Sequence, residues 1–204
     1  MAVSTLTLQE LRDRCEDLLD NPTDLDDKTI IFALNDFLQY YQTEEMSYYP
    51  QKWRNEITIS IDSNGYDLSN ITDLFGTDKG FKVYKGSVSN WNQLFNIRES
   101  GKKRGWYVEG GKLYLNYLGT ASSAVTLVIK YYKKTTKYSS DQSIDTTVIP
   151  VEQGMEKGVE LMVCSRYLEK DQSDPQKAVN MRNDSLAEIQ SFFTTNMKAA
   201  TIQF

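Results

Sequence analysis

The spacing of apolar residues differs between the ends and the middle of this 204-residue chain, and that difference limits the folds open to it. Over roughly the first 50 residues, and again after residue 150, apolar residues recur every three or four positions. This is the period of a helix with one buried face. Between residues 51 and 147 they alternate with polar residues or form short runs, as in strands. We therefore expect helical ends and a β-rich middle.

Two helices are expected before residue 50. Thr7 and Glu10 have the spacing of a capping box, in which each side chain satisfies a backbone amide at the start of a helix. This first helix should end at Asn21-Pro22, because proline cannot continue the hydrogen-bond ladder. The second helix should start between residues 23 and 26 and run to about Tyr41.

Two further helices are expected near the other end of the chain. Proline is tolerated in the first turn of a helix, so Pro150 and Pro175 should each open one, the former reaching about Glu169. Gly154 and Gly158 weaken the earlier of these helices by roughly 0.5 to 1 kcal/mol each relative to alanine. Close packing of a neighbouring helix against those glycines would offset this cost.

The middle of the chain is expected to form antiparallel strands. Isoleucines alternate with polar residues from Ile57 to Ile61, residues 63–65 can turn, and Tyr66-Asp67-Leu68 returns, which predicts a β-hairpin. Gly110-Gly111 should make a tight connection between two later strands. The other strand candidates are residues 81–84, 93–97, 106–109, 113–117 and 125–132.

These elements predict an α+β fold. Neither pair of helices can bury its apolar face alone, so both chain ends should join as a four-helix bundle with an antiparallel sheet or sandwich inserted. The expected domains are residues 1–50 with 148–204 for the bundle, and residues 51–147 for the inserted β domain. The longest apolar run, Ile30 to Leu34, is far below the roughly 18 residues that cross a bilayer, so no membrane segment is expected.

Acidic and basic residues are segregated along the chain, whose formal net charge is −5. Residues 1–50 carry a net −8, residues 51–140 a net +7 and residues 141–204 a net −4. Blocks of opposite sign suggest two structural units, although ordinary solvated faces would also explain them. The overall acidity argues against tight binding of nucleic acid by the whole molecule.

The chemistry of the side chains points away from catalysis. The chain has no histidine, the most frequent general base and metal ligand near neutral pH. Cys15 and Cys164 have no CxxC spacing, which excludes a structural zinc site, and the glycines fit no phosphate-loop pattern. The two cysteines either form a disulfide or, as small hydrophobes, stay reduced in the core. We expect a non-enzymatic protein without catalytic residues, metal or cofactor.

Three groups of residues are candidates for binding a partner. The basic cluster combines cations and an aromatic ring, a mixture that can hold nucleic acid or sugar, although a hairpin tip with solvated charges is the alternative. The aromatic group lies at the junction of helix and sheet and suits either a partner surface or an interdomain core. The C-terminal tail is apolar enough to join another protein, or it is a frayed terminus.

The members of these groups are as follows. The basic cluster is Lys102, Lys103, Arg104 and Trp106. The aromatic group is Tyr40, Tyr41, Tyr48, Tyr49 and Trp53. The C-terminal tail is Lys198, Ala199, Ala200, Thr201, Ile202, Gln203 and Phe204.

The order of the predicted elements, together with six short stretches, resembles one family of viral proteins. The stretches are Ile57-Thr58-Ile59, Tyr66-Asp67-Leu68, Arg98 to Arg104, Lys112-Leu113-Tyr114-Leu115, Val128-Ile129-Lys130-Tyr131-Tyr132 and Val148-Ile149-Pro150-Val151-Glu152. They resemble the head-to-tail adaptor proteins of tailed bacteriophages, which include the tail tubular protein A group. The resemblance covers nearly the whole chain.

The resemblance implies a structural role in the virion neck, after synthesis in the host bacterial cytoplasm. Such adaptors form rings, usually of twelve subunits, below the portal protein, and genome DNA passes through the lumen without sequence-specific binding. In the family the helical part commonly forms the ring and docks to the portal, often through the C-terminus, while the β part meets tail or neck proteins. Carried over, the C-terminal tail becomes the portal-docking candidate and the basic cluster the tail or neck contact.

The sequence is also compatible with functions of other classes. A carbohydrate- or receptor-binding module of a phage tail would use Trp91, Trp106 and nearby tyrosines to stack on sugars. A tail-completion protein would share the features of an adaptor. A hydrolase that relies on carboxylates alone would need two acids facing each other, which the adjacent Glu44 and Glu45 do not provide.

Overall fold

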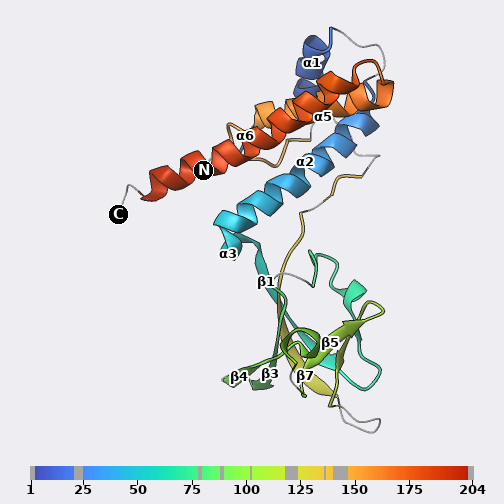
Figure 1. Cartoon of the computed structure of the whole chain (residues 1–204), viewed down its shortest axis with the longest axis vertical. Coiled ribbons are helices and arrows are strands. Elements are labelled where there is room, and N and C mark those ends of the chain that lie inside the picture. Colours follow the sequence, from blue (N-terminus) through green and yellow to red (C-terminus); the bar gives the residue numbers. More distant parts are fainter. Residues whose placement is uncertain are drawn as a thin grey trace. The chain divides into compact units, whose positions relative to one another are not determined.

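The computed structural model describes residues 3–20, 25–77, 80–87, 90–101, 103–117, 124–135, 137–139 and 147–201. The chain divides into two compact units, residues 1–49 with 135–204, and residues 50–134. We call them the helical unit and the β unit, and their elements can be followed in Figure 1. The fold is α+β: helices from both chain ends pack together, and two antiparallel sheets are inserted between them in the sequence.

Helix α1 (Leu8–Leu18) begins as the sequence predicts. The Glu10 amide donates to the Thr7 hydroxyl at 3.1 Å, and the Thr7 amide donates to the Glu10 carboxylate at 2.8 Å, so the capping box is confirmed. Leu19 caps the C-terminal end of the helix. The predicted stop signal, Asn21-Pro22, lies outside the described residues.

Helix α2 (Asp27–Tyr48) starts where expected, with the Asp26 carboxylate accepting a hydrogen bond from the Thr29 amide at 2.7 Å. The predicted end at Tyr41 is wrong, because the helix continues for two more turns. Its buried face extends through Gln42 and Glu45, each 1% exposed. Polar residues had ended the apolar pattern in the sequence, but the Gln42 amide oxygen accepts a hydrogen bond from the Thr135 amide and is satisfied in the core.

Helix α5 spans Glu156–Asp171, so the predicted start at Pro150 is wrong. The residues around Pro150 are extended and pair with the N-terminal segment of the chain. The Ile149 amide donates to the Leu6 carbonyl at 2.9 Å, and the Ser4 amide donates to the Val151 carbonyl at 2.8 Å. Ile149 and Val151, 0% and 1% exposed, form the inward side of this ribbon.

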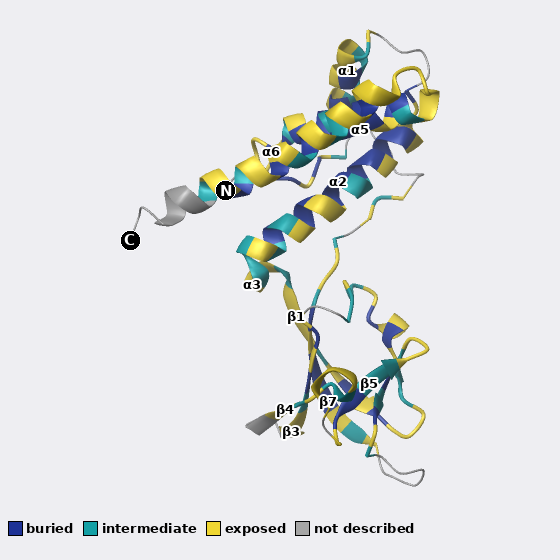
Figure 2. Cartoon of the chain, viewed as in Figure 1, coloured by how far each residue is buried: buried dark blue, intermediate teal, exposed yellow. Residues whose placement is uncertain are grey.

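Helix α6 (Pro175–Thr201) begins at the predicted proline. The Lys177 amide donates to the Asp174 carboxylate at 2.9 Å, so Asp174 acts as the expected cap. Helix α6 packs along α5, α2 packs against both, and α1 packs on α5. Their shared core is made of buried side chains from all four helices and from the ribbon, with Phe37 and Phe193 the largest fully buried ones. Figure 2 shows this burial along α2 and α5 in dark blue.

Gly158 lies at a close approach between helices, as the sequence led us to expect. A Cβ placed on Gly158 would lie 3.0 Å from Cε2 of Phe37, on α2. The hydroxyl of Ser185, on α6, donates to the Gly158 carbonyl at 2.7 Å and is fully buried. Gly154 lies before the helix and has a φ of +99°, a conformation that favours glycine.

The β unit contains two antiparallel sheets. The first has the strand order β1-β7-β3-β4 and the second the order β2-β6-β5. The strands are β1 (Arg54–Ile61), β2 (Tyr66–Asp67), β3 (Lys82–Ser87), β4 (Asn90–Leu94), β5 (Trp106–Glu109), β6 (Lys112–Leu115) and β7 (Val125–Tyr132). Three short helices accompany them: α3 (Pro50–Trp53), η1 (Leu68–Asn70) and α4 (Ile97–Ser100).

The predicted hairpin between β1 and β2 is wrong. Strand β1 pairs along its whole length with β7, and β2 pairs with β6 in the other sheet. The register places Ile57 opposite Ile129 and Ile59 opposite Leu127, which joins two apolar faces in one core. A partner of two residues could not bury the apolar face of β1. The Gly110-Gly111 connection between β5 and β6 is confirmed, with φ values of +55° and +77°.

The helical unit also takes in residues that the sequence had placed in the inserted domain. The Asn35 side chain donates to the Tyr138 carbonyl at 3.0 Å and accepts from the Tyr138 amide at 2.9 Å. These bonds attach the segment after β7 to α2, so the β unit ends at Lys134. Among the described residues, we find no helix whose length and apolarity would let it span a membrane.

Candidate interaction surfaces

The basic cluster lies between α4 and β5. Lys103 and Arg104 are exposed, whereas Lys102 lies outside the described residues. The Asn116 side chain holds this turn: its amide group donates to the Lys103 carbonyl at 2.8 Å, and its oxygen accepts from the Gly105 amide at 2.9 Å. The two cations are therefore carried by a turn with a fixed backbone.

Trp106 does not share the surface with these cations. It is 5% exposed, packs against Phe81 with ring centroids 5.2 Å apart, and its indole donates to the Leu94 carbonyl at 3.2 Å. The structure thus places Trp106 in the core of the β unit, so a partner cannot stack on it. The sequence showed only that it adjoined three cations.

A shallow pocket of about 390 Å³ lies beside this turn in the β unit. Phe95, 54% exposed, and the buried Trp106 are among the residues that line it. Asn96 and Glu99 supply polar groups, with the Asn96 amide donating to the Glu99 carboxylate at 2.8 Å. This combination of an exposed ring with amide and carboxylate groups suits a small polar ligand.

The aromatic group is divided by the structure. Tyr41, 3% exposed, and Tyr48 pack around Phe193 of α6, with ring centroids 5.3 and 5.7 Å from that ring, and Tyr49 adds a third contact. Tyr41 belongs to the core of the helical unit, and Tyr48 and Tyr49 are partly buried against it. Trp53 belongs to the β unit.

Tyr40 is the member of the aromatic group on the surface, with 38% of its area exposed. Its hydroxyl accepts a hydrogen bond from Arg182 at 3.1 Å, across from α2 to α6. Arg182 also pairs with Glu169 at 3.5 Å. Through Arg182, Tyr40 on α2 is therefore linked to Glu169 on α5 and to α6.

The C-terminal tail begins within α6. Its backbone is helical through Thr201, whereas Ile202, Gln203 and Phe204 lie outside the described residues. Phe193 is the last buried residue of α6 whose side chain is described. The helix therefore continues for about two turns beyond the last core contact that the structure describes.

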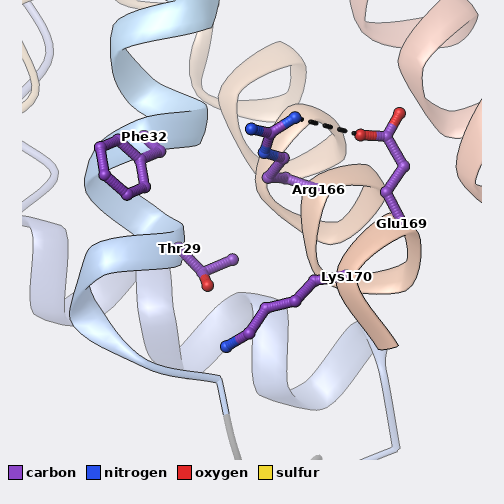
Figure 3. A pocket seen from close by; sticks show the side chains of 5 residues that line it. All are labelled: Thr29, Phe32, Arg166, Glu169 and Lys170. Carbon is purple, nitrogen blue, oxygen red and sulfur yellow. Dashed lines mark hydrogen bonds and ion pairs between the residues drawn. The ribbon is translucent and has the colours of Figure 1, made fainter. Parts of the chain in front are cut away.

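Sequence reasoning missed a pocket of about 420 Å³ between α2 and α5. Figure 3 shows Thr29 and Phe32 on α2 across from Arg166, Glu169 and Lys170 on α5. Phe32 is 51% exposed, although it lies beside the buried residues Ile31 and Ala33. The signal was present in the sequence, because Phe32 falls outside the apolar stripe of its helix.

The cations at this pocket are already paired. Arg166 contacts Glu169 at 3.3 Å, and Lys170 contacts Asp26 at 2.7 Å. The bond from Lys170, together with the Thr29 amide and hydroxyl, lowers the pKa of Asp26 from 3.8 to about 2. The side chains of Arg166 and Lys170 nevertheless remain about half exposed, at 47% and 51%.

The lowered pKa of Asp26 predicts acid sensitivity of the helical unit. Because the ionised form is favoured by folding, its stabilisation is complete above the unfolded pKa and disappears as the pH falls from about 4 to about 2. The loss should stay below about 1 kcal/mol, because both partners are half exposed. Urea unfolding followed by circular dichroism between pH 5 and pH 2 measures it. Asp26→Asn keeps a capping oxygen and should flatten the pH dependence; an equal slope would contradict the assignment.

The two cysteines are reduced and fully buried. Cys15 on α1 and Cys164 on α5 face each other, and the Cys164 thiol lies 4.0 Å from the Cys15 carbonyl. A hydrogen bond between the thiols, with burial, raises the pKa of Cys15 above its ordinary value. The geometry fits the reading of both residues as packed core thiols.

Among the described residues, no group of three or more histidine, cysteine, aspartate or glutamate side chains is placed to hold a metal ion. No protein-family model matches the chain, and no curated protein matches it significantly.

Proposed function

We propose that this protein is a structural head-to-tail adaptor of a tailed bacteriophage. It forms a ring of about twelve copies in the virion neck, between the portal protein and the tail, and genome DNA passes through its lumen. It has no catalytic activity and needs no cofactor. The proposal is based on the resemblance of the sequence to these adaptor proteins. The division of the chain into two units of opposite net charge supports it.

The opposite charge of the two units is the observation that carries this proposal furthest. The helical unit has 21 acidic and 10 basic residues, a net −11, and the β unit has 7 acidic and 13 basic residues, a net +6. A ring needs two different, complementary faces on each copy. Opposite charges on one chain supply long-range complementarity between neighbouring copies and oppose other pairings.

The helical unit is the proposed portal-facing part. We propose that its four helices act as a four-helix bundle and that the docking residues are Lys198 to Phe204, a stretch that begins within α6. An acidic helical wall would repel DNA phosphates, so that the genome slides without binding. A ring whose lumen is lined mainly by lysine would contradict that placement.

The β unit is the proposed contact with tail or neck proteins. Lys103 and Arg104, which follow Lys102 in the sequence, are exposed on the turn that Asn116 holds. Trp106 was a candidate for this contact, but it is buried and is therefore not part of the proposed contact.

Co-expression with the portal protein of the same phage tests this proposal. Deleting residues 198–204 should abolish co-purification with the portal without changing the unfolding midpoint, because the last described core residue is Phe193. The control is Lys103→Glu with Arg104→Glu, which should keep portal binding and lose the salt-sensitive contact with the tail. A full-length chain that neither binds the portal nor appears in the neck of purified virions refutes the adaptor.

The pocket beside Phe95 favours a second candidate, a carbohydrate-binding module. An exposed ring beside an amide and a carboxylate is a usual setting for a sugar, with Phe95 in place of the buried Trp106. Binding of the chain to a glycan array tests this alternative. It would be favoured if Phe95→Ala removes that binding and the chain neither assembles nor binds the portal.

A further inference from the structure

Cys15 and Cys164, which the proposed function does not use, lie side by side in the core of the helical unit. The Cys164 sulfur lies 4.0 Å from the Cys15 carbonyl oxygen, and the Cys15 sulfur lies 3.7 Å from the Glu160 carbonyl oxygen. In a helix the carbonyl of residue 160 accepts from the amide of residue 164, so this second contact also leads to Cys164. A hydrogen bond from the Cys15 thiol lowers the pKa of Cys164. The two thiols are therefore adjacent.

An ion pair beside the thiols fixes how α1 lies along α5. The Arg14 guanidinium contacts the Glu160 carboxylate at 3.0 Å, and the side chain of Glu160 is only 9% exposed. Sliding α1 along α5 would take a partner from this buried carboxylate, which is costly in a core. Arg14 and Cys15 thus contact the same residue of α5, one turn before Cys164. These contacts keep the two thiols facing each other.

We propose that Cys15 and Cys164 form a disulfide when the protein meets a low-molecular-weight disulfide, and that this bond locks α1 onto α5. The two residues are 149 positions apart, and a cross-link removes more entropy from the unfolded chain as the enclosed loop lengthens. The bond should therefore stabilise the helical unit. The pair stays reduced in a reducing compartment and closes in an oxidising one. This inference does not depend on the proposed adaptor function.

Oxidised glutathione can supply the oxidation in two exchange steps. The Cys164 thiolate attacks one sulfur of oxidised glutathione and releases a glutathione thiolate, which leaves a mixed disulfide on Cys164. The Cys15 thiolate then attacks the Cys164 sulfur and releases the second glutathione thiolate. The protons of both cysteine thiols end on the released glutathione, which takes up the two electrons. Both cysteines are 0% exposed, so the first step needs a local opening of α1.

Incubation of the full-length chain with oxidised glutathione tests the bond. Urea is added to just below the start of unfolding, so that local openings admit the oxidant. After quenching and denaturation, thiol titration should fall from two thiols per chain to none, and the mass of the monomer should fall by two hydrogen atoms. Far-UV circular dichroism should then show the urea midpoint of the helical unit raised by about 1 M or more.

Cys15→Ser combined with Asp17→Cys is the matched control. It keeps two thiols but moves one of them two positions along α1, a rotation of roughly 200° to an exposed side of the helix. This variant should hold glutathione at residue 17 without forming a bond to Cys164.

The inference is overturned if, under conditions in which the control has reacted, the parent chain keeps two free thiols, keeps a mixed disulfide, or forms disulfides only between chains. Equal closure of the bond in the control would also overturn it, because closure would then not depend on the facing thiols. An oxidised parent that unfolds at or below the urea midpoint of the reduced chain would show that the bond does not lock α1 onto α5.

Discussion

Replacing Gly105 by alanine should destabilise the β unit by about 3 kcal/mol, because the new methyl group would occupy the place of a backbone atom. A Cβ on Gly105 would lie 2.0 Å from the carbonyl oxygen of Phe95. That oxygen cannot move freely, since it accepts a hydrogen bond from the Trp106 amide at 2.9 Å. The clash therefore has to be relieved by shifting β5 or the turn before it.

Tryptophan fluorescence reports this change selectively. The three tryptophans, Trp53, Trp91 and Trp106, all belong to the β unit. The urea midpoint measured by fluorescence should fall in Gly105→Ala. Gly76→Ala is the matched control, because a Cβ there meets nothing within 4 Å, and its midpoint should stay near that of the parent. Equal midpoints for the two variants would show that the turn around Gly105 is not held as described.

Replacing Gly158 by valine should destabilise the helical unit by about 2 kcal/mol. Even a single Cβ would approach Phe37 to 3.0 Å, and valine adds two methyl groups in the space shared with Glu188 of α6. The substitution also threatens the buried hydrogen bond from Ser185 to the Gly158 carbonyl. Glycine is thus needed here for the close approach of three helices, despite its cost to helix propensity.

Far-UV circular dichroism follows this variant, since the long helices belong to the helical unit. Asn183→Val is the matched control: it places the same β-branched residue at an exposed position of α6. The control should cost less than about 0.5 kcal/mol, a value typical of surface substitutions. If Gly158→Val unfolds at the same urea concentration as the control, the helices do not pack on Gly158 as closely as the structure shows.

Local signals in the sequence were enough for several elements. The capping box of Thr7 and Glu10 and the Asp174-Pro175 start of α6 depend on contacts within one turn of helix. The Gly110-Gly111 connection depends on backbone conformation that glycine adopts without strain. Strands β5 and β7 also have their predicted bounds.

The surfaces were harder to predict, because exposure depends on what packs over each side chain. Trp106 adjoins three cations in the sequence but is covered by Phe81 and bonded to Leu94. Phe32 lies in the longest apolar run yet faces outward. A one-dimensional pattern gives the composition of a surface, whereas burial is a property of the neighbours.

The sequence alone determined the α+β class, most helix and strand positions and the segregation of charge, since these follow from local spacing and composition. Only the tertiary structure decided that β1 pairs with β7, that residues 147–152 join the N-terminal segment, and that Leu18 is exposed. Each of these depends on a partner far away in the chain. Apolar residues pack equally well against many partners, so their spacing does not specify which one they meet.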